Sequence, residues 1–291
     1  MVLVGVAGWS YADWNGTVYP RRKGKDFHPL AYLARYLDLV EINSSFYALP
    51  RPDYASNWAR LVEPFPAFRF TAKLHGAFTH GPLAQLDPTQ ATAFQEGLRP
   101  LREAERLLAL LVQFPVFFRE APEGWERLQR IRDWFPDDHL VLELRHRSWF
   151  TPAVLERLSS LDYGLAHIDL PAARDHPPAE HPSLGTLGYL RVHGRNADTW
   201  FDPKAGRDDR YDYRYDRSEL ETMAERMRGI GKGTERSLLV TNNHFSGQAV
   251  ANALELKQML TGLKPKAPAP LLETFPDLRT WTEPEGQMSL F

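Results

Sequence analysis

The chain has 291 residues, of which 43% are hydrophobic, and 35 basic against 37 acidic residues give it a net charge of -2. This balance excludes a global positive field that would draw the protein onto nucleic acid or a membrane, so any such binding must be local. The sequence contains no cysteine, which excludes disulfides, thiol catalysis and thiolate metal sites. Because no apolar stretch could span a bilayer and the first residues lack a signal peptide's basic segment, we expect a cytoplasmic protein with no membrane partner.

Apolar runs typical of buried strands alternate with segments of helical periodicity along the chain. The expected strands are 2–7, 39–43, 68–74, 107–114, 140–145, 164–169, 187–193 and 237–242. The expected helices are 29–37, 52–62, 88–104, 122–134, 152–161, 218–227 and 248–260. Near-continuous apolar strands separated by helices indicate a parallel sheet buried on both faces. Eight such strands predict an α/β fold, a single (β/α)8 TIM-type barrel.

An open doubly wound sheet is the alternative architecture. It is disfavoured because residues 5–10, Gly-Val-Ala-Gly-Trp-Ser, lack the spacing of a dinucleotide-binding turn. Beyond residue 262 the composition changes to the Pro-rich run Lys-Pro-Lys-Ala-Pro-Ala-Pro of residues 264–270. We therefore predict a barrel domain over residues 1–262 and a Pro-rich C-terminal tail over residues 263–291.

Polar residues gather at the carboxyl ends of the predicted strands, where TIM barrels carry their active sites. Glu41 and Asn43 are two residues apart and share one face of their strand, as do Glu143 and Arg145. Buried charges are costly unless they are paired or used, so a network of salt bridges and a functional site both fit the pattern. For the whole set we favour a site. Its other members at strand ends are Lys73, Gln113, His167, Asp169, Arg191, His193 and Asn242.

Several segments resemble the YecE-like family, which is also named domain of unknown function 72. They include residues 8–11 (Gly-Trp-Ser-Tyr), 40–47 (Val-Glu-Ile-Asn-Ser-Ser-Phe-Tyr), 143–150 (Glu-Leu-Arg-His-Arg-Ser-Trp-Phe), 191–195 (Arg-Val-His-Gly-Arg) and the pair 242–243 (Asn-Asn). The matching segments run in the expected order from residue 5 to about residue 256. The resemblance implies a TIM-type barrel. It implies no activity, because none is established for the family.

Three functions fit the polar set. In the first, Glu41, Glu143, Asp169 and His193 are the catalytic residues and hold a divalent metal ion, Mg, Mn or Zn. With phosphate bound by the nearby cations, the protein would be a metal-assisted phosphodiester hydrolase of nucleic-acid metabolism or repair. In the second, Glu41 and Glu143 serve as acid and base in a sugar or sugar-phosphate enzyme. The third is a non-catalytic binding barrel.

The expected substrate-binding residues combine cations, amides and aromatic rings. They are Trp9, Tyr11, Asn43, Tyr47, Lys73, Arg145, His146, Trp149, Arg191, Arg195 and Asn242. The long loop after the seventh predicted strand mixes rings such as Trp200 and Tyr211 with arginines, a composition suited to stacking nucleic-acid bases. Aspartates in the same loop offset its charge, so a solvated lid is the competing interpretation.

The last five residues resemble the clamp-binding pentapeptide of bacterial replication and repair proteins. They are Gln287, Met288, Ser289, Leu290 and Phe291. A glutamine offers a polar contact, and the adjacent leucine and phenylalanine offer two apolar anchors to a pocket. A terminal Leu-Phe pair can also dock on its own domain, but its position after a Pro-rich spacer favours a partner. We therefore expect a sliding clamp as a partner and nucleic acid as a second one.

The clamp interaction is testable by calorimetric titration of a bacterial sliding clamp. We expect the full-length chain to bind with a Kd on the order of 1 μM and a chain ending at Gly286 to show no binding. The full-length double variant Leu290→Ala with Phe291→Ala should lose binding equally, because it removes the two anchors and keeps the chain length. Equal affinity of all three forms would assign the five residues another role.

Overall fold

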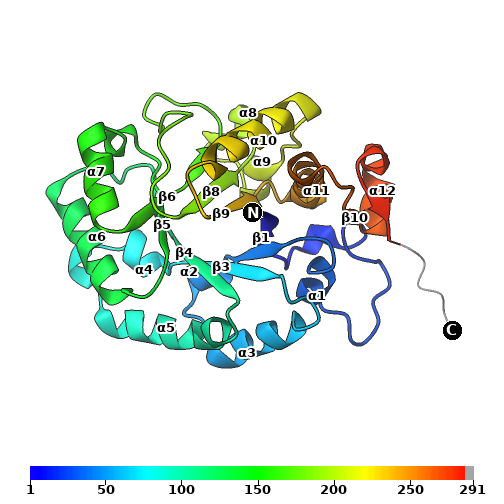
Figure 1. The fold of residues 1–291 in the computed structure, drawn as a ribbon, viewed down its shortest axis with the longest axis horizontal. Helices are drawn as coiled ribbons and strands as arrows, with labels where there is room; N and C mark the ends of the chain where they lie inside the picture. The colour runs from blue at the N-terminus through cyan, green and yellow to red at the C-terminus, as the bar shows by residue number, and fades with distance from the viewer. Residues whose placement is uncertain (286–291) are drawn as a thin grey trace.

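The computed structural model describes residues 1–285, and in this part of the chain nine parallel strands form the central sheet. The helices are arranged around that sheet (Figure 1). The strands are β1 (Val2–Ala7), β2 (Leu39–Ile42), β3 (Arg69–Lys73), β4 (Leu107–Gln113), β5 (Leu140–Glu143), β6 (Tyr163–Leu165), β7 (His167–Asp169), β8 (Leu187–Val192) and β9 (Arg236–Thr241). Their bounds agree closely with the strands expected from apolar patterning.

The sheet closes into a barrel through one interrupted strand. Neighbouring strands follow the order β6-β5-β4-β3-β2-β1-β9-β8-β7, so β6 and β7 stand at its two ends. Only Ala166 separates them along the chain, and its N–H donates to the carbonyl of Leu142 (2.8 Å). The single strand predicted at 164–169 is thus divided, because its first part pairs with β5 and its second part with β8. The predicted TIM-type α/β barrel is confirmed.

Helices connect the strands and cover the outside of the barrel (Figure 1). They are α1 (Pro29–Leu33), α2 (Ser44–Tyr47), α3 (Pro52–Leu61), α4 (Gly76–Thr79), α5 (Pro88–Glu103), α6 (Pro122–Trp134), α7 (Pro152–Ser160), α8 (Ala197–Trp200), α9 (Arg207–Tyr211), α10 (Arg217–Gly231), α11 (Gln248–Thr261) and α12 (Ala269–Thr274). Among the described residues, none of the helices combines the length and the apolar character needed to cross a membrane.

Two helix ends differ from the prediction for local reasons. The first helix stops at Leu33, and the chain reaches β2 through tight turns rather than through helix up to residue 37. The helix predicted at 218–227 runs from Arg217 to Gly231, and a capping box marks its start. Asp216 Oδ1 accepts from the Glu219 N–H (2.9 Å), and Glu219 Oε2 accepts from the Asp216 N–H (3.0 Å).

Apolar side chains fill the barrel in addition to the space between barrel and helices. The interior group consists of Leu3, Ala7, Leu39, Ala109, Val141, Ala166, Leu187, Tyr189, Leu238 and Val240. Because side chains alternate along a strand, residues two or four positions beyond these also point inward. On β2 and β8 this rule directs Glu41 and Arg191 into the barrel, above an apolar floor.

Residues 263–285, which belong to the tail predicted from sequence, pack against the barrel. This segment contains β10 (Lys266–Ala267), α12, a 3-10 helix (Pro276–Thr280) and β11 (Glu283–Pro284). Leu271 and Leu278 are fully buried in the main core, and the Arg217 guanidinium lies 3.8 Å from the ring centre of Trp281. The domain boundary at residue 262 stays a prediction, and the clamp-binding peptide at 287–291 lies outside the described residues.

The packing of this segment can be tested by urea unfolding. Leu278→Ala should lower the free energy of unfolding by about 2–5 kcal/mol, as expected when a buried leucine is truncated. Leu263→Ala is the matched control, because that side chain is 73% exposed and its loss should change the free energy by less than about 0.5 kcal/mol. If both substitutions have the same small effect, the segment does not contribute to the core in solution.

Candidate functional site

Three charged side chains from β2, β5 and β8 meet inside the barrel. Arg191 Nη2 donates to Glu41 Oε1 (2.6 Å), and Arg191 Nε donates to Glu41 Oε2 (3.1 Å). Arg191 Nη1 donates to Glu143 Oε2 as well. All three side chains are buried, and the exposed fraction is 1% for the arginine and 0% for both glutamates. One guanidinium group thus joins two carboxylates that lie about a hundred residues apart in the sequence.

Further contacts saturate the two carboxylates. The Tyr189 hydroxyl donates to Glu41 Oε2 (2.8 Å) and lies 2.9 Å from the Thr71 hydroxyl. Arg145 Nε and Nη2 each lie 2.7 Å from Glu143 Oε1. Burial alone would raise the pKa of Glu143, but Arg191 and Arg145 lower it well below its ordinary value. Glu143 is therefore held ionised by two arginines, which disfavours its predicted use as a general acid.

His193 lies beside this ion cluster as a neutral ring. It is fully buried, and burial lowers its pKa from 6.5 to about 4 despite the nearby Glu143 carboxylate. Asn242 Nδ2 donates to His193 Nδ1 (3.0 Å), and His193 Nε2 lies 3.3 Å from Arg191 Nη1 and 3.6 Å from Glu143 Oε2. The cluster therefore contains a neutral histidine and no additional positive charge at neutral pH.

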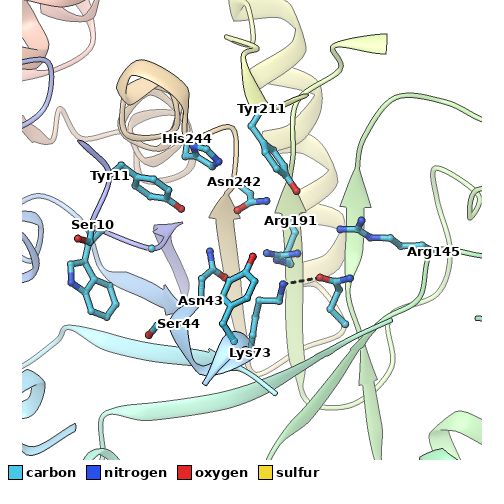
Figure 2. A pocket seen from close by; sticks show the side chains of 14 residues that line it. Ser10, Tyr11, Asn43, Ser44, Lys73, Arg145, Arg191, Tyr211, Asn242 and His244 are labelled. Carbon is cyan, nitrogen blue, oxygen red and sulfur yellow. Dashed lines mark hydrogen bonds between the residues drawn. The ribbon is translucent and has the colours of Figure 1, made fainter. Parts of the chain in front are cut away.

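A pocket opens above the cluster at the carboxyl ends of the strands (Figure 2). Its lining consists of Gly8, Trp9, Ser10, Tyr11, Asn43, Ser44, Tyr47, Lys73, Gln113, Arg145, Arg191, Tyr211, Asn242 and His244. Eight predicted substrate-binding residues are in this set: Trp9, Tyr11, Asn43, Tyr47, Lys73, Arg145, Arg191 and Asn242. Among the described residues, no aspartate or glutamate lines it, because Glu41 and Glu143 lie beneath the arginines.

Lys73 carries an amine into the pocket from the end of β3 (Figure 2). Its Nζ donates to Gln113 Oε1 (2.8 Å) and lies 4.4 Å from the ring centre of Phe46. Burial, followed by the positive charge of Arg191, lowers the pKa of Lys73 from 10.5 to about 8. Among residues 1–285, no carboxylate oxygen lies within the 4.0 Å ion-pair distance of this amine.

Aromatic rings form the outer wall of the pocket. The rings of Tyr11 and His244 are stacked with centres 4.5 Å apart, and Tyr211 lies 5.1 Å from His244. Tyr47 stands at the rim with 77% of its surface exposed. The Asn43 Oδ1 atom is buried and has no hydrogen-bond partner within the described structure, although its residue lines the pocket.

Asp169 is not part of this arrangement. Ala166 faces the barrel interior, so Asp169, three positions further, points to the other side of the strand. There Arg195 donates to both of its carboxylate oxygens (2.8 and 2.9 Å), and the Tyr215 hydroxyl donates to Oδ2 (2.6 Å). The structure therefore does not bring the four predicted metal ligands together. In the described part of the chain, no group of three or more His, Asp and Glu side chains could hold a metal ion.

His146 and Trp149 are also outside the pocket. His146 Nδ1 accepts from the Ser148 N–H (3.2 Å), which caps a short 3-10 helix (Arg147–Trp149). Trp149 is fully buried, and its Nε1 donates to the carbonyl of Phe118 (2.8 Å). These two residues and Arg195 hold the loops that surround the mouth, and they do not line the pocket itself.

Six lining residues were not predicted as substrate-binding residues: Gly8, Ser10, Ser44, Gln113, Tyr211 and His244. Gln113 is the last residue of β4, and its inward register follows from Ala109, which lies in the interior group. His244 follows the end of β9 by three residues, so its position after a strand was a usable signal. Tyr211 comes from the loop after β8, and no local pattern distinguishes it from the other tyrosines of that loop.

Comparisons with known proteins agree with this architecture. A family model described as "Protein of unknown function DUF72" matches residues 3–274. The UPF0759 protein YunF of Bacillus subtilis is 26% identical over 285 residues, which cover 91% of this chain and 98% of YunF. The UPF0759 protein YecE of Escherichia coli K12 is 28% identical over 167 residues, covering 57% of this chain and 55% of YecE. A crystal structure of a DUF72 family protein from Thermotoga maritima has a TM-score of 0.78 and 32% identity, covering 89% of this chain and 99% of that protein.

The neutral state of His193 predicts a pH-dependent stability. Its pKa is about 4 in the fold and about 6.5 in the unfolded chain, so the unfolded state binds more protons as the pH falls from 6.5 to 4. Wild-type stability should fall over this window, and His193→Gln should remove up to about 3 kcal/mol of that fall, because one pKa unit corresponds to about 1.4 kcal/mol. Urea unfolding at pH 7.0 and pH 4.5 measures the difference. His139→Gln, at an exposed histidine, is the matched control, and a wild-type pH dependence in His193→Gln would contradict the prediction.

Proposed function

This chain belongs to the DUF72 family, whose function is unknown, and we propose from its barrel mouth that it is an enzyme of small anionic metabolites of the sugar-phosphate class. The pocket lies at the carboxyl ends of parallel strands, the position of the active site in TIM-barrel enzymes. Its substrate would carry a phosphate or a carboxylate for the cations and hydroxyl groups for the amides. The proposal keeps the substrate class of the second function that the sequence suggested, but not the acid and base roles of Glu41 and Glu143.

The observation that carries the proposal is the charge balance of the mouth. Two carboxylates, Glu41 and Glu143, face three cations, Arg191, Arg145 and Lys73, while His193 is neutral. One positive charge is therefore left over, and the cations line the pocket whereas both carboxylates are buried below it. A buried excess charge is unfavourable unless a ligand compensates it, which supports an anion as the ligand of this pocket.

The neutral part of the lining suits a polyhydroxylated compound. Asn43 Oδ1 has no hydrogen-bond partner within the described residues. Gln113, Asn242 and Ser10 add amide and hydroxyl groups around the cations. Rings of Tyr11 and Tyr211 form one wall, which offers an apolar face beside these polar groups (Figure 2). A sugar phosphate has the same combination of one anionic group, several hydroxyls and apolar C–H faces.

Metal-assisted phosphodiester hydrolysis uses the same cations for phosphate but requires ligands that the mouth does not present. Glu41 and Glu143 already accept hydrogen bonds from arginine, and Asp169 faces the other side of its strand. The geometry therefore favours the metabolite function, with the carboxylates holding arginines rather than acting as acid and base. Binding of Mg, Mn or Zn stays a prediction, as do nucleic-acid binding and clamp recruitment, which depends on residues 287–291 outside the described chain.

Anion binding is testable by calorimetry with ribose 5-phosphate, ribose and sulfate. Ribose 5-phosphate should bind at least about tenfold more tightly than ribose, and Lys73→Gln should weaken it about tenfold or more, since a charge-assisted hydrogen bond contributes about 1.5–3 kcal/mol. Lys232→Gln makes the same charge change at an exposed residue just before β9, at the opposite end of the barrel, and should change affinity less than twofold, that is by less than about 0.4 kcal/mol.

The pH and metal dependence of the same binding separate the alternatives. Sulfate does not titrate in this range, so its affinity should fall as the pH rises through about 8, where Lys73 loses its proton. A chelator should leave the affinity unchanged if the cations alone hold the anion. If binding requires a divalent metal, the result favours the phosphodiester hydrolase over the metabolite enzyme. If the protein does not prefer ribose 5-phosphate to ribose, the metabolite proposal is wrong.

A further inference from the structure

The Lys73 amine is placed as a nucleophile and not only as a cation. It reaches the pocket from the last residue of β3, and its Nζ is held between the Gln113 side-chain oxygen and the face of Phe46. The hydrogen bond to a neutral amide fixes the position of the amine without stabilising its charge as a carboxylate would. Another pocket lysine is absent from the described residues, so the role belongs to this side chain alone.

The surroundings of the amine favour its neutral form. Burial acts first, and the Arg191 guanidinium acts in the same direction, so the pKa of Lys73 is about 8. About half of the protein molecules would therefore carry a nucleophilic amine at pH 8. Lys257 shows the opposite arrangement in the same chain, because its Nζ donates to Asp38 Oδ1 (2.7 Å) in an ion pair.

We propose that Lys73 forms an imine with the carbonyl carbon of an open-chain sugar phosphate or a similar anionic keto compound. This inference rests on the proposed function and names the substrate class and the covalent step of that same pocket. Arg145 binds Glu143 through Nε and Nη2, which leaves Nη1 for the anionic group of the substrate. In its neutral form Lys73 is then the nucleophile, and Arg145 is the cation that binds the anionic group.

Imine formation at Lys73 needs no oxidant, reductant or other reagent beyond the amine and the carbonyl compound. The lone pair of neutral Nζ attacks the carbonyl carbon, a C–N bond forms, and the carbonyl oxygen takes a proton to give a carbinolamine. Loss of that oxygen as water, with one proton from the nitrogen, gives the imine, so an amine and a carbonyl yield an imine and one water molecule. The Tyr211 phenol and the imidazole of His244 line the same pocket as groups able to transfer these protons. A protonated imine withdraws electrons from the neighbouring carbon, as in enzymes that make or break bonds next to a carbonyl.

Reductive trapping tests the covalent step with the full-length protein. Borohydride reduces an imine to a stable secondary amine, which peptide mapping by mass spectrometry assigns to one lysine. Dihydroxyacetone phosphate should label Lys73 at least about tenfold more than Lys232 or Lys257 in the same sample, and pyruvate reports whether a carboxylate serves as well. Uncharged dihydroxyacetone should label Lys73 about tenfold less than its phosphate, because it lacks the group that the arginine binds.

Lys73→Arg separates the proposal from the simpler electrostatic role. This variant keeps a cation, so it should retain ribose 5-phosphate binding within about threefold, less than about 0.7 kcal/mol, while losing all trapping at position 73. Its thermal midpoint confirms that it is folded. Anion binding by the wild type without preferential trapping at Lys73 overturns the imine and leaves the proposed function standing. Absence of both binding and trapping overturns both proposals, and equal trapping of charged and uncharged ketones overturns the anionic substrate class.

Discussion

The buried contact of Arg191 with Glu41 and Glu143 is the interaction on which the mouth of the barrel depends. It joins β8 to β2 and β5 across the interior, where no other side chains in the described chain supply the opposite charge to these glutamates except Arg145. Removing one partner of such a buried network leaves an uncompensated charge, at a cost of about 3–5 kcal/mol. Well-packed apolar residues would close the barrel at least as stably. Stability of the barrel therefore does not require the network, and what distinguishes it from apolar packing is the set of arginines that it places in the pocket lining.

The side of the network that faces the pocket is cationic, because the arginines line the pocket and the carboxylates that bind them lie beneath. Tyr189 and Thr71 support Glu41 from the apolar floor, and burial keeps His193 neutral. The arginines remain charged while the histidine adds no charge, so the excess positive charge is set by packing and solvation together. Lys73 lies beside these cations, and desolvation together with the positive charge of Arg191 favours its neutral amine. The surface that we propose for anion binding and the amine that we propose as a nucleophile thus belong to the same cluster.

The loops around the mouth are fixed by a second network that does not enter the pocket. Asp169 binds Arg195 and Tyr215, and the Tyr215 hydroxyl also accepts from the Gly194 N–H (2.8 Å). These contacts anchor both ends of the long segment between β8 and α10, and that segment carries Tyr211 to the pocket wall.

The sequence by itself determined the barrel and the inward face of its strands. The apolar period of the strands predicted eight repeats, and spacing by two residues placed Glu41 with Asn43 and Glu143 with Arg145, because side-chain alternation is a local property. Only the tertiary structure decided which polar groups meet. Arg191 lies 150 residues from Glu41, and pairing across the barrel depends on the register of strands that no local pattern records. The same holds for the inward face of the sixth predicted strand: the core places Ala166 inside the barrel, so Asp169, three positions further, faces away from the carboxylates with which the sequence had grouped it.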